Sequence, residues 1–302
     1  MNNISNRTKG ILCIICAAFC FAFMNAFVKL AGDLPSIEKS FFRNFVALII
    51  AFFVLIKKKE GFHIVKGAFI CLFLRSFFGT IGILCNFYAI DHLVISDASM
   101  LNKMSPFFAI IFSYFILKEK LTLRQGLIVI TAFIGSLFII KPTFSNASLF
   151  PSVLGLIGGM GAGIAYTMVR ILGKKGQHAS FVVFFFSGFS CLVTLPYLIF
   201  NYHPMTKMQL ISLLLAGVSA AGGQYSITAA YMFAPAKEIS VYDYSQIIFA
   251  AILGFIMFGQ TPDIFSVIGY VIIISVAIIN YKLSFKASHE QKILPNSASV
   301  LK

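Results

Sequence analysis

The chain has 302 residues, of which 59% are hydrophobic and 11% are charged, and its mean hydropathy is +0.92. Soluble domains have roughly 45–50% apolar and about 25% charged residues, so the composition excludes a soluble domain and indicates an all-α polytopic membrane protein. The net charge of +14 would favour nucleic acid in a soluble chain. Here the basic residues lie in short loops and in the last residues, where membrane topology accounts for them, and we expect no nucleic-acid partner.

Five apolar runs, each close to the length of a membrane span, occupy the first half of the chain. The predicted helices cover residues 10–31, 36–56, 67–90, 94–117 and 121–140. The first run follows a short basic start, as in a signal peptide, but no clear small-residue cleavage site comes after it, so we expect an uncleaved helix. A short charged hinge, Lys118-Glu119-Lys120, turns the fourth and fifth runs into a membrane hairpin.

A loop that carries Pro, Ser and Asn separates this half from a second one. Five further helices are predicted at residues 152–172, 180–200, 208–233, 236–258 and 264–281. The predicted organisation is a first five-helix repeat at 1–141, a linker at 142–151, a second five-helix repeat at 152–282 and a polar, basic tail at 283–302. We expect this tail to be disordered.

The distribution of Lys and Arg predicts the orientation of the ten helices. Of the 24 basic residues, 17 fall on one side of the membrane, three on the other and four within helices. The positive-inside rule therefore places both termini in the cytoplasm. Because each half has an odd number of helices, the second half enters the membrane from the opposite side. Such inverted repeats are typical of transporters, which bind their substrates near the midplane between the repeats.

Several segments resemble one transporter family. They read FFRNFVALIIAFFVL, LFLRSFFGTIGILCNFYAI, ISDASMLNKMSPFFAIIFSYFILKEKLT, FIGSLFIIKP and YDYSQIIFAAILGFIMFGQTPD, in this order along the chain. They resemble the EamA-like branch of the drug/metabolite transporter superfamily, and the likeness extends from Gly10 to Lys282. The stretches 36–43 and 242–263 are also similar to the S-adenosylmethionine-type carriers. The resemblance implies ten helices in two inverted halves, cytoplasmic termini, a bacterial plasma (inner) membrane and transport of small metabolites.

Ionisable residues deep within the apolar runs are the first candidates for a binding site. A charge near the bilayer centre costs at least about 2.5–3.5 kcal/mol and usually faces an interior cavity. Lys103 is the deepest cation, roughly 13 Å from the outer end of its helix at about 1.5 Å per residue. Arg75 and Asp243 are predicted at similar depths, where they could pair with each other. Asp97 begins the fourth helix, where capping of the helix and a functional role are equally good explanations.

Neutral polar and aromatic side chains would complete a cavity around these charges. Each of them alone is more often an interhelical hydrogen-bonding group than a ligand contact. The candidates are Asn25, Asn86, Tyr88, Asn102, Gln224, Tyr225 and Tyr244. Glycines recur every four residues at Gly155, Gly159 and Gly163, a pattern that permits close helix approach and suits either sliding or static packing.

The predicted function is secondary active transport, or exchange, of a small polar metabolite such as an amino acid or an S-adenosylmethionine-like compound, by alternating access. Asp97 and Asp243 are the candidates for coupling to a proton. Apart from the substrate and that proton, the expected partners are membrane lipid and, in a homodimer, a second copy of the chain. The histidines share no metal-ligand spacing with one another or with the cysteines, so we expect neither a metal nor a cofactor, and no enzyme. The alternative is a membrane scaffold or partner-binding subunit that transports nothing.

Overall fold

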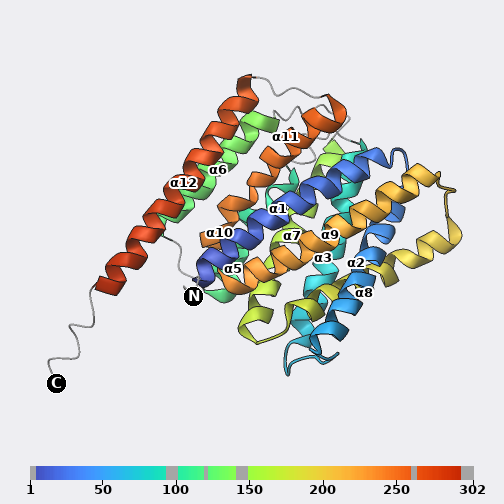
Figure 1. Ribbon diagram of the computed structural model, residues 1–302, viewed down its shortest axis with the longest axis horizontal. Helices are drawn as coiled ribbons and strands as arrows, with labels where there is room; N and C mark the ends of the chain where they lie inside the picture. Colours follow the sequence, from blue (N-terminus) through green and yellow to red (C-terminus); the bar gives the residue numbers. More distant parts are fainter. Residues whose placement is uncertain (1–4, 93–100, 119–121, 141–148, 260–263, 294–302) are drawn as a thin grey trace.

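The computed structural model describes residues 5–92, 101–118, 122–140, 149–259 and 264–293, and all regular structure in these ranges is helical (Figure 1). Apolar runs form helices here because a helix satisfies its own backbone hydrogen bonds, as the hydrocarbon of a membrane requires. The helices of the first half are α1 (Asn6–Leu30), α2 (Ser36–Lys58), α3 (Phe69–His92), α5 (Ser105–Leu117) and α6 (Leu123–Ile140). The start of the predicted fourth helix, the residues 119–120 of the hinge and most of the predicted linker lie outside the described residues.

The second half contributes six helices to the described structure. They are α7 (Leu149–Lys174), α8 (Ala179–Phe200), α9 (Lys207–Phe233), α10 (Ala236–Asp243), α11 (Ser245–Phe258) and α12 (Ile264–Ile293). Most ends agree with the predicted helices to within a few residues, because hydropathy marks where a span begins and ends.

Two predictions for the second half need correction. The predicted helix at 236–258 is interrupted at Tyr244, so that α10 and α11 are separate helices. The tail was predicted to be disordered from residue 283, but α12 continues to Ile293. The sequence from Lys282 to Ile293 contains no Gly or Pro and several good helix formers, and Pro295 follows it, which explains why the helix extends beyond the apolar run.

Seven helical segments in the described part of the chain are long and apolar enough to cross a membrane, with α10 and α11 counted together as one segment at 238–258. Three shorter apolar segments, at 107–117, 126–135 and 267–279, lie within the other predicted spans. The protein is therefore an all-helical, multi-pass membrane protein by length and composition.

The two halves pack against each other rather than forming separate bundles. Helix α1 of the first half lies against α9 of the second, and α3 lies against α7. Helix α2 packs on α8 at one edge of the molecule, and α6 packs on α12 at the opposite edge (Figure 1). By order within each half, α1 corresponds to α7, α2 to α8, α3 to α9 and α6 to α12. When each helix is exchanged with its counterpart, the pair α1·α9 becomes α7·α3, and the pairs α2·α8 and α6·α12 stay the same. The contacts are therefore reciprocal between the halves.

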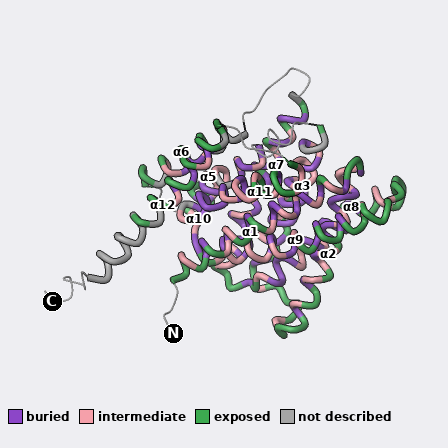
Figure 2. The backbone as a smooth tube through the Cα atoms, turned by 45° about the horizontal axis from the view of Figure 1, so that its top comes forward, coloured by how far each residue is buried: buried purple, intermediate pink, exposed green. Residues whose placement is uncertain are grey.

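Burial is greatest where the halves meet. Figure 2 shows buried residues concentrated on the central helices, including α1, α7 and α9, and exposed residues toward the ends of α2 and α8. Helices α1 and α9 carry fully buried small residues such as Ala17, Ala220 and Ala230, and small residues let membrane helices approach closely. Large apolar side chains such as Phe53, Phe115 and Leu192 face outward, as expected for a surface in contact with lipid.

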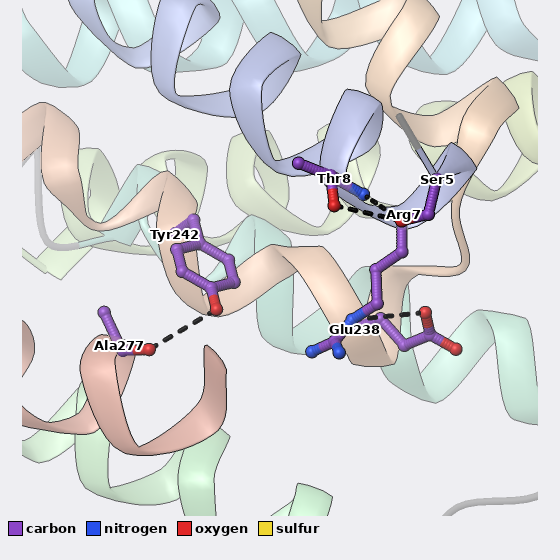
Figure 3. A network of polar contacts seen from close by, with 6 residues as sticks. All are labelled: Ser5, Arg7, Thr8, Glu238, Tyr242 and Ala277. Carbon is purple, nitrogen blue, oxygen red and sulfur yellow. Dashed lines mark hydrogen bonds and ion pairs between the residues drawn. The ribbon is translucent and has the colours of Figure 1, made fainter. Parts of the chain in front are cut away.

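The first turn of α1 is tied to α10 beside it (Figure 3). Ser5 caps α1, because its hydroxyl accepts a hydrogen bond from the Thr8 backbone N–H at 3.2 Å. Arg7 Nε lies 3.7 Å from Glu238 Oε2 on α10. The Tyr242 hydroxyl at the other end of α10 donates to the Ala277 carbonyl of α12 at 3.3 Å. Short helix α10 is thus held between α1 and α12.

The glycine stripe on α7 explains how this helix comes close to its neighbours. A Cβ at Gly155 would meet the Leu101 side chain, one at Gly159 would meet the Leu101 carbonyl oxygen, and one at Gly163 would meet Phe108. The stripe is therefore the contact surface between α7 and the segment from Leu101 to Phe108, where any larger side chain would displace backbone.

We expect Gly159→Ala to destabilise the protein by about 1–3 kcal/mol, because the new methyl group overpacks the contact with Leu101. Gly126→Ala is the matched control, since nothing lies within 4 Å of a Cβ at that helical glycine. The control should be neutral or more stable by about 0.5–1 kcal/mol, the usual gain of Ala over Gly in a helix. Equilibrium unfolding by SDS in detergent micelles measures both, and equal changes would contradict the packing argument.

Candidate functional site

Two interruptions in neighbouring helices lie at the centre of the candidate site. Residues 103 and 104 form a turn before α5 begins at Ser105, and Tyr244 separates α10 from α11. Pro106 occupies the second position of α5, where proline is well tolerated because its missing N–H needs no partner. The buried Tyr244 hydroxyl donates to the Lys103 carbonyl at 3.2 Å. The two interruptions therefore support each other directly across the halves.

A buried ion pair joins the same two positions. Lys103 Nζ lies 3.4 Å from Asp243 Oδ2 and donates to Gln246 Oε1 at 2.6 Å. Lys103 is 5% exposed and Asp243 3% exposed. Removing one partner of a buried pair leaves an uncompensated charge, which is far more costly than loss of a surface pair. This pair therefore fixes how the first half meets the second at this depth.

A polar cavity of about 80 Å³ lies next to this pair. Its lining comes from both halves of the chain, and its members are mostly polar or small. They include Asn25, Arg43, Arg75, Asn86, Asn102, Lys103 and Ser105 of the first half and Tyr166, Gln224, Asp243 and Gln246 of the second.

Two arginines line the cavity, and each is only 2% exposed. Arg75 Nη2 donates to Gln224 Oε1 at 2.8 Å, and its guanidinium carbon lies 4.0 Å from the centroid of the Phe186 ring. A Cβ at Gly79, one turn along α3, would collide with Arg75 Nη1 and with Phe186. The absence of a side chain at Gly79 therefore leaves the space that the Arg75 guanidinium occupies.

Arg43 is held by neutral groups of α1 and α2. Its Nε donates to Met24 Sδ at 3.0 Å, and its Nη1 donates to Asn44 Oδ1 at 2.9 Å. Asn44 in turn donates to Ser190 Oγ of α8 at 2.9 Å. This chain of polar contacts fixes Arg43 at the junction of the two halves.

Most of the predicted site residues come together around the cavity. Those that line it are Asn25, Arg75, Asn86, Asn102, Lys103, Gln224 and Asp243. Tyr244 lies beside it, fully buried, as the support of the Lys103 turn. Tyr88 is instead stacked on His92 near the end of α3, and neither Tyr88 nor Tyr225 belongs to the lining. Asp97 lies outside the described residues.

The structure also corrects and extends the predicted site. Arg75 and Asp243, which the sequence suggested could pair, have other partners: Asp243 pairs with Lys103, and Arg75 binds Gln224. Arg43 and Gln246 line the cavity although sequence reasoning had left them out of the site. Gln246 follows Asp243 by only three residues, and this spacing was the signal that the sequence offered. In the described ranges, no cluster of three or more His, Cys, Asp or Glu side chains could hold a metal ion.

The Lys103–Asp243 pair makes a direct prediction about stability. We expect Asp243→Asn to cost about 3–5 kcal/mol, because Lys103 remains buried without its counter-charge. The double variant Lys103→Met with Asp243→Asn should recover a large part of this loss. In the more exposed pair of Lys58 and Glu60, which are 3.7 Å apart, the control Glu60→Gln should cost less than about 1 kcal/mol. SDS unfolding in micelles measures each variant, and additive losses in the double variant would contradict a coupled pair.

Comparison with known proteins places the chain among transporters. The model of the EamA-like transporter family matches twice, at residues 8–141 and at 150–281. The chain is 32% identical over 269 residues to the pseudopaline exporter CntI of Pseudomonas aeruginosa, an alignment that covers 88% of this chain and 93% of that protein. It is 26% identical over 277 residues to the S-adenosylmethionine uptake transporter of Rickettsia prowazekii, with 87% and 90% covered.

The fold has a counterpart among solved structures. One crystal structure superposes with a TM-score of 0.79 over 93% of this chain and 99% of the other, at 12% sequence identity, a likeness that shows the fold alone. The two matches of the family model and the named relatives settle the class: the chain belongs to the EamA-like transporter family and is a membrane transporter, not an enzyme.

Proposed function

We propose that this transporter is a secondary carrier, or an exchanger, that moves a small polar metabolite across the plasma membrane by alternating access. The observation that carries the proposal is the polar cavity between the two halves, lined by Arg43, Arg75 and the Lys103–Asp243 pair. Charged groups buried in a membrane protein usually mark a substrate or ion pathway. Interrupted helices beside such a cavity are the usual construction of a transporter binding site.

The proposed architecture is an inverted repeat of two five-helix units with both termini in the cytoplasm. Two features support it: the reciprocal contacts of α1·α9 with α7·α3, and the accumulation of Lys and Arg on the side of the termini. Each half would then move as a unit around the central cavity. Reporter proteins fused to either terminus would reveal on which side of the membrane it lies.

The size of the cavity supports a cycle of opening and closing. Its volume of about 80 Å³ is smaller than the roughly 300–1,000 Å³ of typical ligand pockets. A metabolite would therefore need the halves to move apart before it enters. The Lys103–Asp243 pair connects the halves across this cavity, and its rearrangement would accompany that movement.

The test of transport uses the protein reconstituted into proteoliposomes. We expect uptake of at least one compound from a panel of amino acids, pseudopaline and S-adenosylmethionine, the last two being the compounds named for relatives. We also expect Lys103→Ala to abolish uptake, because it removes a cavity cation and leaves Asp243 unpaired. Exposed Lys29→Ala is the matched control. Equal rates in empty liposomes and in those with wild-type protein, across the panel, would refute the function.

Coupling to protons is the second measurement at this site. We expect uptake by the wild-type protein to respond to an imposed pH gradient and Asp243→Asn to remove this response, because an amide cannot bind and release the proton. Asp97→Asn tests the other candidate carboxylate in the same way. Glu60→Gln, which removes a carboxylate that does not line the cavity, should respond like the wild type. A pH response that persists in both Asp variants would exclude these carboxylates as the coupling groups.

A further inference from the structure

The charges that line the cavity do not balance. Arg43, Arg75 and Lys103 are its cations, and Asp243 is the only acid among the described lining residues. Asp243 is paired with Lys103, so the ion pair neutralises itself. The two arginines remain without a counter-charge.

Neither guanidinium has a carboxylate partner within the described part of the chain. Arg75 donates to the neutral side chain of Gln224, and Arg43 donates to Asn44 and to the thioether of Met24. The Nε of Arg75 is buried and has no hydrogen-bond partner among the described residues. A guanidinium offers five N–H donors in a planar fork, so donors remain for a ligand. A buried donor without a partner is costly, and an acceptor within a ligand would remove that cost.

Two helix N-termini add to the positive potential. Ser105 is the first residue of α5 and Gln246 the second residue of α11, and both line the cavity. Neither helix has an acidic residue in its first turn. The N-terminal end of a helix carries a partial positive charge that favours anions, and half-helix N-termini serve anionic substrate groups in other transporters.

We propose, on the basis of the function proposed above, that the substrate is a carboxylate-bearing metabolite with a net negative charge. Arg75 and Arg43 bind its carboxylates, because the planar guanidinium fork pairs with a carboxylate through two parallel hydrogen bonds. The N-terminal ends of α5 and α11 favour the same charge. A cation would be repelled by the two uncompensated arginines, so the cavity excludes cationic substrates.

The test compares ligands that differ in charge. The full-length protein in detergent is heated with citrate or glutamate as anions, glutamine as the neutral analogue of glutamate, and lysine or S-adenosylmethionine as cations, because a ligand of the folded state raises its stability. Uptake of the same compounds is measured in proteoliposomes. We expect citrate or glutamate to stabilise the protein and to be taken up, and glutamine to have a much smaller effect at equal concentration.

The possible outcomes separate this inference from the proposed function. Uptake of glutamine, lysine or S-adenosylmethionine in preference to both anions would overturn the charge preference and leave the carrier function in place. Stabilisation by the anions without uptake would support the charge preference and overturn the transport function. A panel with neither stabilisation nor uptake would overturn both.

Variants test the role of the arginines. We expect Arg75→Gln to weaken anion binding by about tenfold or more, the effect of losing a hydrogen bond to a charged group. Arg75→Lys should retain part of the anion preference because it retains the charge. Arg124→Gln, the same change at an exposed residue of α6, should bind like the wild type. Arg43→Gln is the second variant if Arg75→Gln does not fold, and unchanged anion affinity in either folded cavity variant would overturn the assignment.

Discussion

The central constraint on this structure is that a charged side chain buried between apolar helices requires a partner. Lys103 and Asp243 meet at 3.4 Å between the halves, and each comes from a position where a helix is interrupted. An interruption exposes backbone groups that hydrocarbon cannot satisfy. The Tyr244 hydroxyl satisfies one of these groups, because it donates a hydrogen bond to the Lys103 carbonyl. Charge pairing and backbone satisfaction are therefore met by two neighbouring contacts between the halves.

Close packing of the surrounding helices makes that contact possible. Gly158 of α7 lies against the backbone of Gly82 on α3, and Gly159 lies against Leu101 just before the Lys103 turn. Side chains at these positions would hold the helices apart. In a membrane such small-residue contacts replace the hydrophobic driving force, which is absent between helices in lipid. The glycines thus bring α7 close to α3 and to the segment that leads into the Lys103 turn. Whether the same surfaces also slide depends on the transport cycle.

Sequence reasoning predicted the helices well and the site in part, for one physical reason. Hydropathy reports the depth of a residue along a helix, so the spans, Lys103 and Asp243 were found. It does not report which way a side chain points, so the partner of Arg75 was not found. Adjacent residues differ by about 100° around a helix, and Gln224 accordingly lines the cavity whereas Tyr225 does not. The interruption at Tyr244 depends on a contact with the other half, which no local pattern contains.

The distribution of charge within the cavity bears on how a transport cycle would proceed. The Lys103–Asp243 pair joins the halves but contributes no net charge, whereas Arg43 and Arg75 contribute two positive charges from α2 and α3. An empty cavity would have to carry this charge while the halves rearrange around it in a medium of low dielectric, which is costly. A bound anion would neutralise it. Under the proposed charge preference, the loaded carrier would therefore rearrange more readily than the empty one, which is the condition that favours exchange of one anion for another over net transport.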